Sequence, residues 1–114
     1  MADDITGGAN ESVAVTDWKA CYNSGEGVIS LSCKVTTNDS SAAISGVGLI
    51  LNNSQGSTLA SSYAELSNGC KSVTPALNLP LGGLKVGDVV WGVVSGEVHD
   101  QHYFFEQKLV IETC

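Results

Sequence analysis

Turn-forming residues recur at regular intervals along this chain, and their spacing limits the possible folds more than any other feature. Six clusters rich in Gly, Asn, Asp and Ser separate segments rich in β-branched residues; they lie at 23–27, 38–41, 52–57, 67–71, 81–83 and 99–102. Such spacing is typical of antiparallel strands joined by short loops, whereas helices favour runs of Ala, Leu, Glu and Lys. We therefore expect an all-β chain.

Six separators predict seven strands, at 13–22, 28–37, 44–51, 58–66, 72–80, 86–98 and 103–113. Two of these segments alternate apolar and polar residues, which indicates one packed face and one solvated face. The predicted packed faces carry Ile29, Leu31, Cys33 and Val35 in one segment and Val73, Leu77, Leu79 and Leu81 in and just after the other. Both faces need a second sheet, so we expect an antiparallel β-sandwich; a small Greek-key barrel is the alternative.

The charge balance excludes several classes of partner. The chain has 12 acidic and 5 basic residues, a net charge of −7 and no Arg. Arg is the residue that binds phosphate in bidentate fashion, so nucleic acid and anionic membranes are not expected partners. The apolar runs at 47–51 and 89–94 are too short to cross a membrane, and no membrane insertion is expected. We interpret 1–12 as an acidic lead-in and 13–114 as a single domain.

Two short patterns resemble known sandwich modules. The run 31–35, Leu-Ser-Cys-Lys-Val, resembles the second strand of an immunoglobulin-like domain. The run 84–90, Leu-Lys-Val-Gly-Asp-Val-Val, is similar to the corner before the sixth strand of immunoglobulin-like and fibronectin type III-like modules. Immunoglobulin domains carry a Cys in the sixth strand and a Trp in the third strand, and this sequence has neither at those places. The resemblance implies an immunoglobulin-like fold that binds other molecules through loops or sheet faces, with no catalytic residue.

The four cysteines, Cys21, Cys33, Cys70 and Cys114, contain no CxxC pair and match no zinc-ligand spacing. An even number in a short chain favours disulfides in an oxidising compartment, hence a secreted or cell-surface protein. Four reduced cysteines in a cytosolic protein are the alternative.

The expected register of the first two strands limits which cysteines can form disulfides. In a hairpin around 23–27, Cys21 and Cys33 are offset by four residues, roughly 13 Å, whereas a disulfide needs Cα atoms within about 7 Å. Two pairings stay open: Cys21–Cys114 with Cys33–Cys70, or Cys21–Cys70 with Cys33–Cys114. We favour the first, because Cys33 faces inward on a central strand and a Cys21 bond would fix the last residue.

The last predicted hairpin carries the candidate partner-binding residues. A loop centred between Asp100 and Gln101 pairs residues whose numbers sum to 201, such as Gly96 with Phe105. The outer face then presents an apolar strip rimmed by charge, formed by Trp91, Val93, Phe104 and Val110. Such a strip suggests a contact site for a protein or carbohydrate surface. A loop or the 1–12 lead-in covering Trp91 is the alternative.

His99, Asp100 and His102 form a second candidate group at the tip of this hairpin. The expected register places the two histidines opposite each other, where they could share a metal or respond to pH. Two ligands do not make a metal site, so solvated loop residues are the main interpretation. We expect no metal and no cofactor.

No catalytic motif is present, and the only two histidines share one turn, so we expect no enzyme. The main hypothesis is an extracellular recognition or adhesion module. A structural subunit of a fibre, capsid or surface layer is an alternative, and with it a homo-oligomer. A carbohydrate-binding module is a third hypothesis, but it needs more surface aromatic residues than this chain offers: only Trp18, Trp91, Phe104 and either Tyr22 or Tyr63 are available to stack on sugars.

Overall fold

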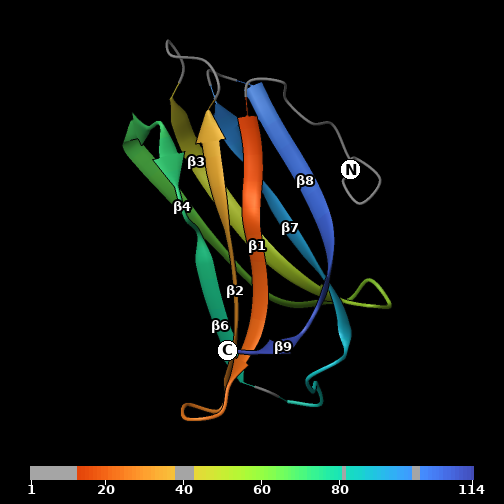
Figure 1. Cartoon of the computed structure of the whole chain (residues 1–114). Coiled ribbons are helices and arrows are strands. Elements are labelled where there is room, and N and C mark those ends of the chain that lie inside the picture. The colour runs from red at the N-terminus through yellow and green to blue at the C-terminus, as the bar shows by residue number, and fades with distance from the viewer. Residues whose placement is uncertain (1–12, 38–42, 81, 99–100) are drawn as a thin grey trace.

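Two β-sheets pack face to face in the computed structural model, which describes residues 13–37, 43–80, 82–98 and 101–114 (Figure 1). The predicted 1–12 lead-in lies outside the described residues. Nine strands occur in the described part of the chain: β1 (Val13–Asn23), β2 (Val28–Thr37), β3 (Ile44–Asn53), β4 (Thr58–Cys70), β5 (Ser72–Val73), β6 (Ala76–Pro80), β7 (Val89–Val98), β8 (Gln101–Val110) and β9 (Glu112–Thr113). The prediction of an all-β sandwich is confirmed.

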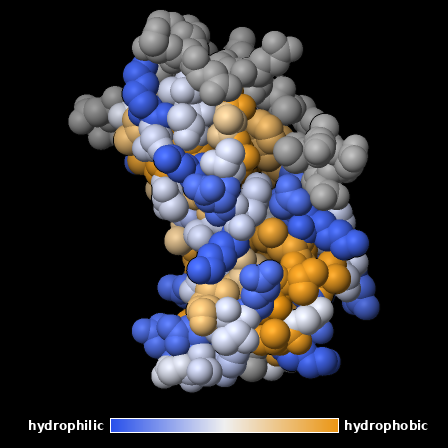
Figure 2. Space-filling model, viewed as in Figure 1, coloured by the Kyte–Doolittle hydropathy of each residue, from blue (hydrophilic) through white to orange (hydrophobic). Residues whose placement is uncertain are grey.

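The first sheet has five strands, in the order β5-β2-β1-β9, with β6 also pairing with β2. The second has four, in the order β4-β3-β7-β8. Figure 2 views the outer face of the five-stranded sheet, which carries mainly hydrophilic residues over β1, β2 and β6. An apolar area lies beside β1, where β8 passes into β9.

The structure differs from the purely antiparallel prediction at the last strand. The chain leaves the four-stranded sheet after β8, and β9 pairs with β1 in parallel, so the five-stranded sheet is mixed. Ile111 marks the crossing: its N donates to Asp88 O and its O accepts from Gly87 N. The predicted strand 103–113 is therefore two strands in different sheets.

The predicted strand 72–80 is also divided, into β5 and β6. Pro75 lies between them and has no N–H to donate to a strand ladder, although its O accepts a hydrogen bond from Cys33 N. These two divisions account for the difference between seven predicted strands and nine observed.

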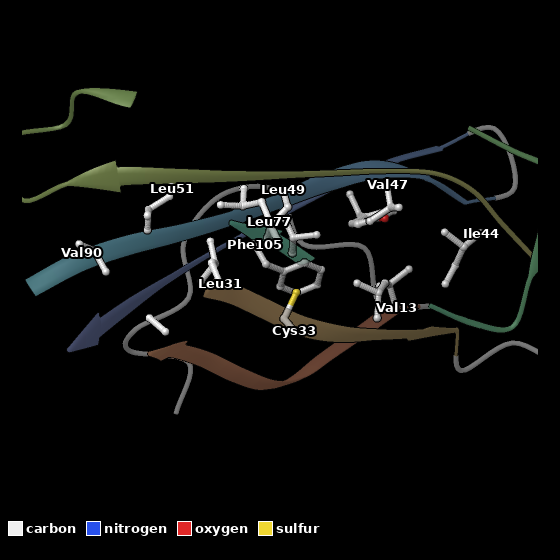
Figure 3. Packing of buried hydrophobic residues seen from close by; sticks show 14 of the residues in the cluster. Val13, Leu31, Cys33, Ile44, Val47, Leu49, Leu51, Leu77, Val90 and Phe105 are labelled. Carbon is white, nitrogen blue, oxygen red and sulfur yellow. The ribbon is translucent and has the colours of Figure 1, made fainter. Parts of the chain in front are cut away.

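The core lies between the two sheets (Figure 3). Alternate residues of β2, from Ile29 to Val35, are fully buried, as the sequence pattern predicted. They belong to the same core cluster as Leu49 and Leu51 of β3 and Val90 and Val94 of β7, which are also fully buried. Burying a side chain of this size stabilises the fold by about 1.5–3 kcal/mol, so this packing is the main source of stability.

A β-bulge in β1 directs Trp18 into the core. The register with β2 shifts between Thr16 and Lys19, and Asp17 has a φ of 59°, a left-handed conformation that Asp tolerates better than most residues. Trp18 then packs over Gly92 of β7, where a Cβ atom would lie 3.0 Å from Trp18 Cε3. Gly92 therefore leaves room for the indole ring.

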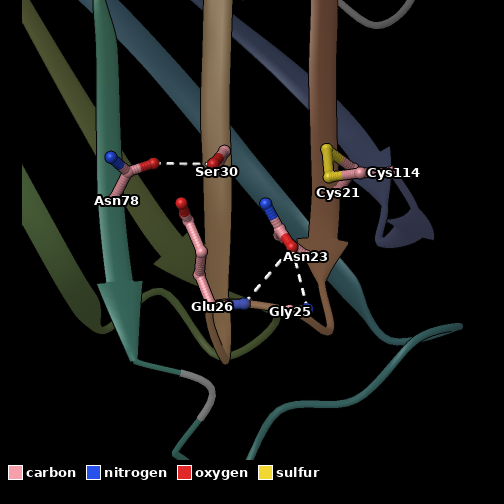
Figure 4. The surroundings of a disulfide bond; sticks show 7 residues. All are labelled: Cys21, Asn23, Gly25, Glu26, Ser30, Asn78 and Cys114. Carbon is pink, nitrogen blue, oxygen red and sulfur yellow. Dashed lines mark hydrogen bonds between the residues drawn. A yellow bond between two sulfur atoms is a disulfide. The ribbon is translucent and has the colours of Figure 1, made fainter.

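The disulfide joins Cys21 of β1 to Cys114, with Cα atoms 4.9 Å apart (Figure 4). This bond belongs to the pairing that we favoured. Cys114 N also donates to Tyr22 O, which fixes the segment after β9 against β1.

The second bond of that pairing, Cys33–Cys70, is wrong, because both cysteines are free. Cys33 points from β2 into the interior (Figure 3). Thr37 N donates to Lys71 O, so the residue after Cys70 lies opposite a position four residues from Cys33 along β2. That offset is roughly 13 Å, beyond the approximately 7 Å that a disulfide spans.

Candidate functional site

The β7–β8 hairpin has a tighter register than predicted. The numbers of paired residues sum to 199 instead of the predicted 201, so that Val98 pairs with Gln101 and Gly96 pairs with Tyr103. The difference is an even number of residues, so each side chain keeps its predicted face while its neighbours change. On the outer face Trp91 now lies opposite Lys108, and Ser95 lies opposite Phe104.

The predicted apolar strip is not continuous in the structure. Trp91 is half-buried and Val93 is only 5% exposed, whereas Phe104 and Val110 on the edge strand β8 are 37% and 50% exposed. In the strand ladders, Val93 lies between Ile50 of β3 and Glu106 of β8. The exposed part of the strip is therefore its β8 edge.

Of the predicted His99–Asp100–His102 group, only His102 lies within the described residues. It pairs with Glu97 in the register, and its Nε2 lies 3.6 Å from Glu97 Oε2 in a solvent-exposed position. Over the described ranges, no cluster of three His, Cys, Asp or Glu residues has the arrangement to hold a metal ion.

Exposed large apolar side chains concentrate on the four-stranded sheet. Among the residues that the structure describes, they are Leu59, Tyr63, Val86, Phe104 and Val110. Four belong to the edge strands β4 and β8, and Val86 lies in the turn before β7. The outer face of the five-stranded sheet is polar by contrast: Ser30 Oγ donates to Asn78 Oδ1 at 2.6 Å, beside Ser32 and Lys34 (Figures 2 and 4).

Tyr63 is the most exposed of these side chains, at 60%. It pairs with Gly48 across the β3–β4 ladder, and its ring extends along two glycines of β3. A Cβ atom on Gly48 would lie 3.1 Å from Tyr63 Cδ1, and one on Gly46 would collide with the Tyr63 hydroxyl. The two glycines thus let the ring lie close to the sheet surface, where any larger residue would displace it.

Gly46 is contacted from both faces of the sheet. From the inner face, the Tyr103 hydroxyl donates a hydrogen bond of 3.0 Å to Gly46 O. Burial raises the pKa of Tyr103 well above its ordinary value, so the hydroxyl keeps its proton over the physiological range. Tyr103 therefore holds the β3 backbone in place beneath Tyr63.

Polar side chains border this ring. Ser61 and Glu65 lie two residues before and after Tyr63 on β4, on the same outer face, and both are exposed. Ser95 of β7 pairs with Gly48 and is the next side chain across the sheet. We call this arrangement the Tyr63 platform: Tyr63 over Gly46 and Gly48, bordered by Ser61, Glu65 and Ser95.

The platform combines an exposed aromatic ring with hydroxyl and carboxylate acceptors, which suits binding of a ligand with both C–H and O–H groups. In the sequence alone, Tyr63 is only one of several aromatic residues that could stack on a sugar. The signal that could have singled it out is the Gly46-x-Gly48 pattern beside an aromatic residue in the next strand, since aromatic side chains often cover glycines in sheets.

No protein-family model matches the chain, and no curated protein matches its sequence. Solved structures match its fold. A DUF3823 family protein from Bacteroides ovatus superposes with a TM-score of 0.58 at 14% identity, covering 88% of this chain and 55% of that one. The likeness shows the fold alone.

OgpA from Akkermansia muciniphila is similar as well. Its wild type has a TM-score of 0.55 at 15% identity, covering 96% of this chain and 31% of that one. A catalytically inactive form, in complex with an O-glycopeptide (glycodrosocin) substrate, has a TM-score of 0.56 at 14% identity. That match covers 92% of this chain and 30% of the other. The chain therefore spans about a third of OgpA and about half of the DUF3823 protein.

Proposed function

We propose that this chain is a non-catalytic recognition module that binds a glycosylated protein partner through the outer face of its four-stranded sheet. One observation carries the proposal: Tyr63 is 60% exposed on a sheet face whose glycines bring its ring close to the surface. Exposed aromatic side chains with a polar border are typical of recognition surfaces.

The strand order supports an immunoglobulin-like or fibronectin type III-like module. Its first two long strands, β1 and β2, share a sheet with β6, as the A, B and E strands of such domains do. The strands β3, β7 and β8 share the other sheet, in the manner of the C, F and G strands, with β4 beside β3. In many unrelated proteins, domains of this kind bind other molecules through their loops and sheet faces.

The disulfide supports placing the module outside the cytosol. A Cys21–Cys114 bond suggests an oxidising compartment, so we propose that the protein is secreted or displayed at the cell surface. In the described part of the chain, no helix is long and apolar enough to cross a membrane.

The similarity to OgpA favours a glycosylated partner over a bare protein surface. The domain that resembles this chain belongs to a protein that takes an O-glycopeptide as substrate.

The test measures binding to immobilised mucin, a heavily O-glycosylated protein, with one variant on each sheet face. Ser95→Arg places a bulky side chain in the middle of the four-stranded face, and Ser32→Arg does the same on the outer face of the five-stranded sheet. We expect the wild type and Ser32→Arg to bind alike and Ser95→Arg to lose about tenfold or more in affinity. Absence of binding, or equal binding by both variants, would contradict the proposal.

A further inference from the structure

We propose that the Tyr63 platform binds a neutral sugar, with the C–H face of one pyranose ring stacked on the Tyr63 ring. This inference rests on the proposed function and specifies the ligand of the same face. Three properties of the platform favour this ligand: the exposure of the ring, the hydrogen-bonding groups around it and the charge of the surrounding surface.

The ring offers a surface that a sugar can cover. Tyr63 remains 60% exposed although one side of it, from Cδ1 to the hydroxyl, runs along Gly48 and Gly46. The face of an aromatic ring is electron-rich and attracts weakly positive C–H groups such as those on one side of a pyranose. Ordering costs little here, because the glycine contacts already restrict the ring before a ligand arrives.

The border of the ring provides acceptors for sugar hydroxyls. Ser61 and Glu65 flank Tyr63 on β4, roughly 7 Å away on either side at the usual strand rise. Ser95 lies two strands away, roughly 10 Å across the sheet, with only the bare backbone of Gly48 between. Carboxylate oxygens accept hydrogen bonds and hydroxyls both donate and accept, which complements the O–H groups at a sugar's edge.

The charge of the surface selects a neutral sugar over an anionic one. Glu65 and Glu97 lie on the same outer face as the platform, and the whole chain carries a charge of −7. Sialylated or sulfated sugars would be repelled by these carboxylates, and the chain has no Arg with which to bind their acidic groups. Because a neutral sugar carries no net charge, its binding would depend only weakly on salt.

Binding of neutral oligosaccharides, meaning released and desialylated mucin O-glycans, would test the inference by calorimetry. Tyr63→Leu keeps an apolar side chain over the glycines but removes the aromatic face, and Tyr63→Phe keeps that face. We expect Tyr63→Leu to lose about tenfold or more in affinity and Tyr63→Phe to bind within about twofold of the wild type. Leu59→Ala, which removes another exposed apolar side chain of β4, is the matched control and should bind like the wild type.

Three results would overturn the inference: no binding of any neutral oligosaccharide, wild-type affinity of Tyr63→Leu, or binding restricted to sialylated glycans and weakened by salt. Mucin stripped of its O-glycans separates this inference from the proposed function. If stripped mucin still binds and Ser95→Arg abolishes that binding, the four-stranded face recognises protein and the sugar assignment fails alone. If neither form of mucin binds, both proposals fail.

Discussion

At the scale of single residues, glycines decide where the aromatic side chains of this protein lie. Gly92 leaves space for Trp18 inside the sandwich, and Gly46 and Gly48 leave space for Tyr63 on its outer face. Leu109 of the neighbouring strand β8 also borders Gly92. It lies 3.3 Å from a Cβ at position 92, yet the bulge at Asp17 brings Trp18 closer.

Gly92→Ala should therefore lower the free energy of unfolding. A methyl group there would lie 3.0 Å from Trp18 Cε3, in a packed interior that can adjust only by shifting the indole ring or the sheet. Overpacking of this kind costs about 1–3 kcal/mol. Urea denaturation measures the change, and Gly83→Ala is the control, because a Cβ at position 83 meets nothing within 4 Å. Equal stabilities for the two variants would contradict this role of Gly92.

Cys33 makes stability depend on pH in the alkaline range. Burial raises the pKa of its thiol from the ordinary value of 9.0 to about 12. Above pH 9 the unfolded chain loses this proton while the folded chain keeps it, so the free energy of unfolding falls as pH rises, by up to about 1.4 kcal/mol per pH unit. The raised pKa of Tyr103 adds to the decline above its own ordinary value of 10.0.

Urea denaturation at several pH values between 8 and about 10 checks this effect, with Cys33→Ala as the comparison. The variant is expected to start less stable, because it leaves a small cavity, but to lose less stability between pH 9 and 10. Parallel pH profiles for the two proteins would show that Cys33 does not titrate as its burial requires.

At the scale of elements, the sequence predicted which segments are strands better than it predicted how they pair. The alternation in 28–37 correctly identified the buried face of β2. In the last hairpin the faces were right and the register was off by two residues, because a shift by an even number leaves the apolar pattern unchanged. No sequence periodicity marks the point, at Ile111, where the chain passes from one sheet to the other. This passage depends on hydrogen bonds between Ile111 and both Gly87 and Asp88, in the turn before β7.

The disulfide is expected to stabilise this arrangement of elements substantially. It closes a sequence separation of 93 residues and fixes β9 to β1. Replacing both Cys21 and Cys114 with Ser should lower the free energy of unfolding by about 2–4 kcal/mol, in a model where the bond restricts the unfolded chain. Cys70→Ser, which removes a free thiol, is the control and should change stability little.

Thiol titration without reductant checks the cysteine assignment separately. We expect two thiols per chain in denaturant, from Cys33 and Cys70. In the native state only the partly exposed Cys70 should react readily, since Cys33 is fully buried and its pKa is raised. Four thiols would remove the argument for an oxidising compartment, and none would restore the Cys33–Cys70 bond.

At the scale of the whole molecule, the two outer faces differ in character. The five-stranded sheet presents mainly polar side chains (Figure 2). The edges of the four-stranded sheet present Tyr63, Phe104 and Val110. The candidate strip predicted from sequence lies on the same sheet as Tyr63 but does not include it. That omission has a physical cause: the exposure of Tyr63 depends on which strand pairs with the β3 glycines, and one strand alone does not reveal its partner.

The recognition hypothesis and the structural-subunit hypothesis differ in the mass they predict in solution. A recognition module with a charge of −7 should be a monomer of 11.8 kDa by light scattering. Concentration-dependent growth into dimers or larger species would favour the subunit hypothesis and the homo-oligomer that it implies.

The central claim is that the four-stranded face, around Tyr63, is the binding surface. The most direct test is to titrate isotopically labelled protein with desialylated mucin O-glycans and follow the backbone amide signals by NMR. The account predicts shifts centred on Tyr63, Gly46, Gly48 and Ser95, with the signals of Ser30, Ser32 and Asn78 unchanged. Shifts confined to the five-stranded sheet, or no shifts at saturating glycan, would contradict it.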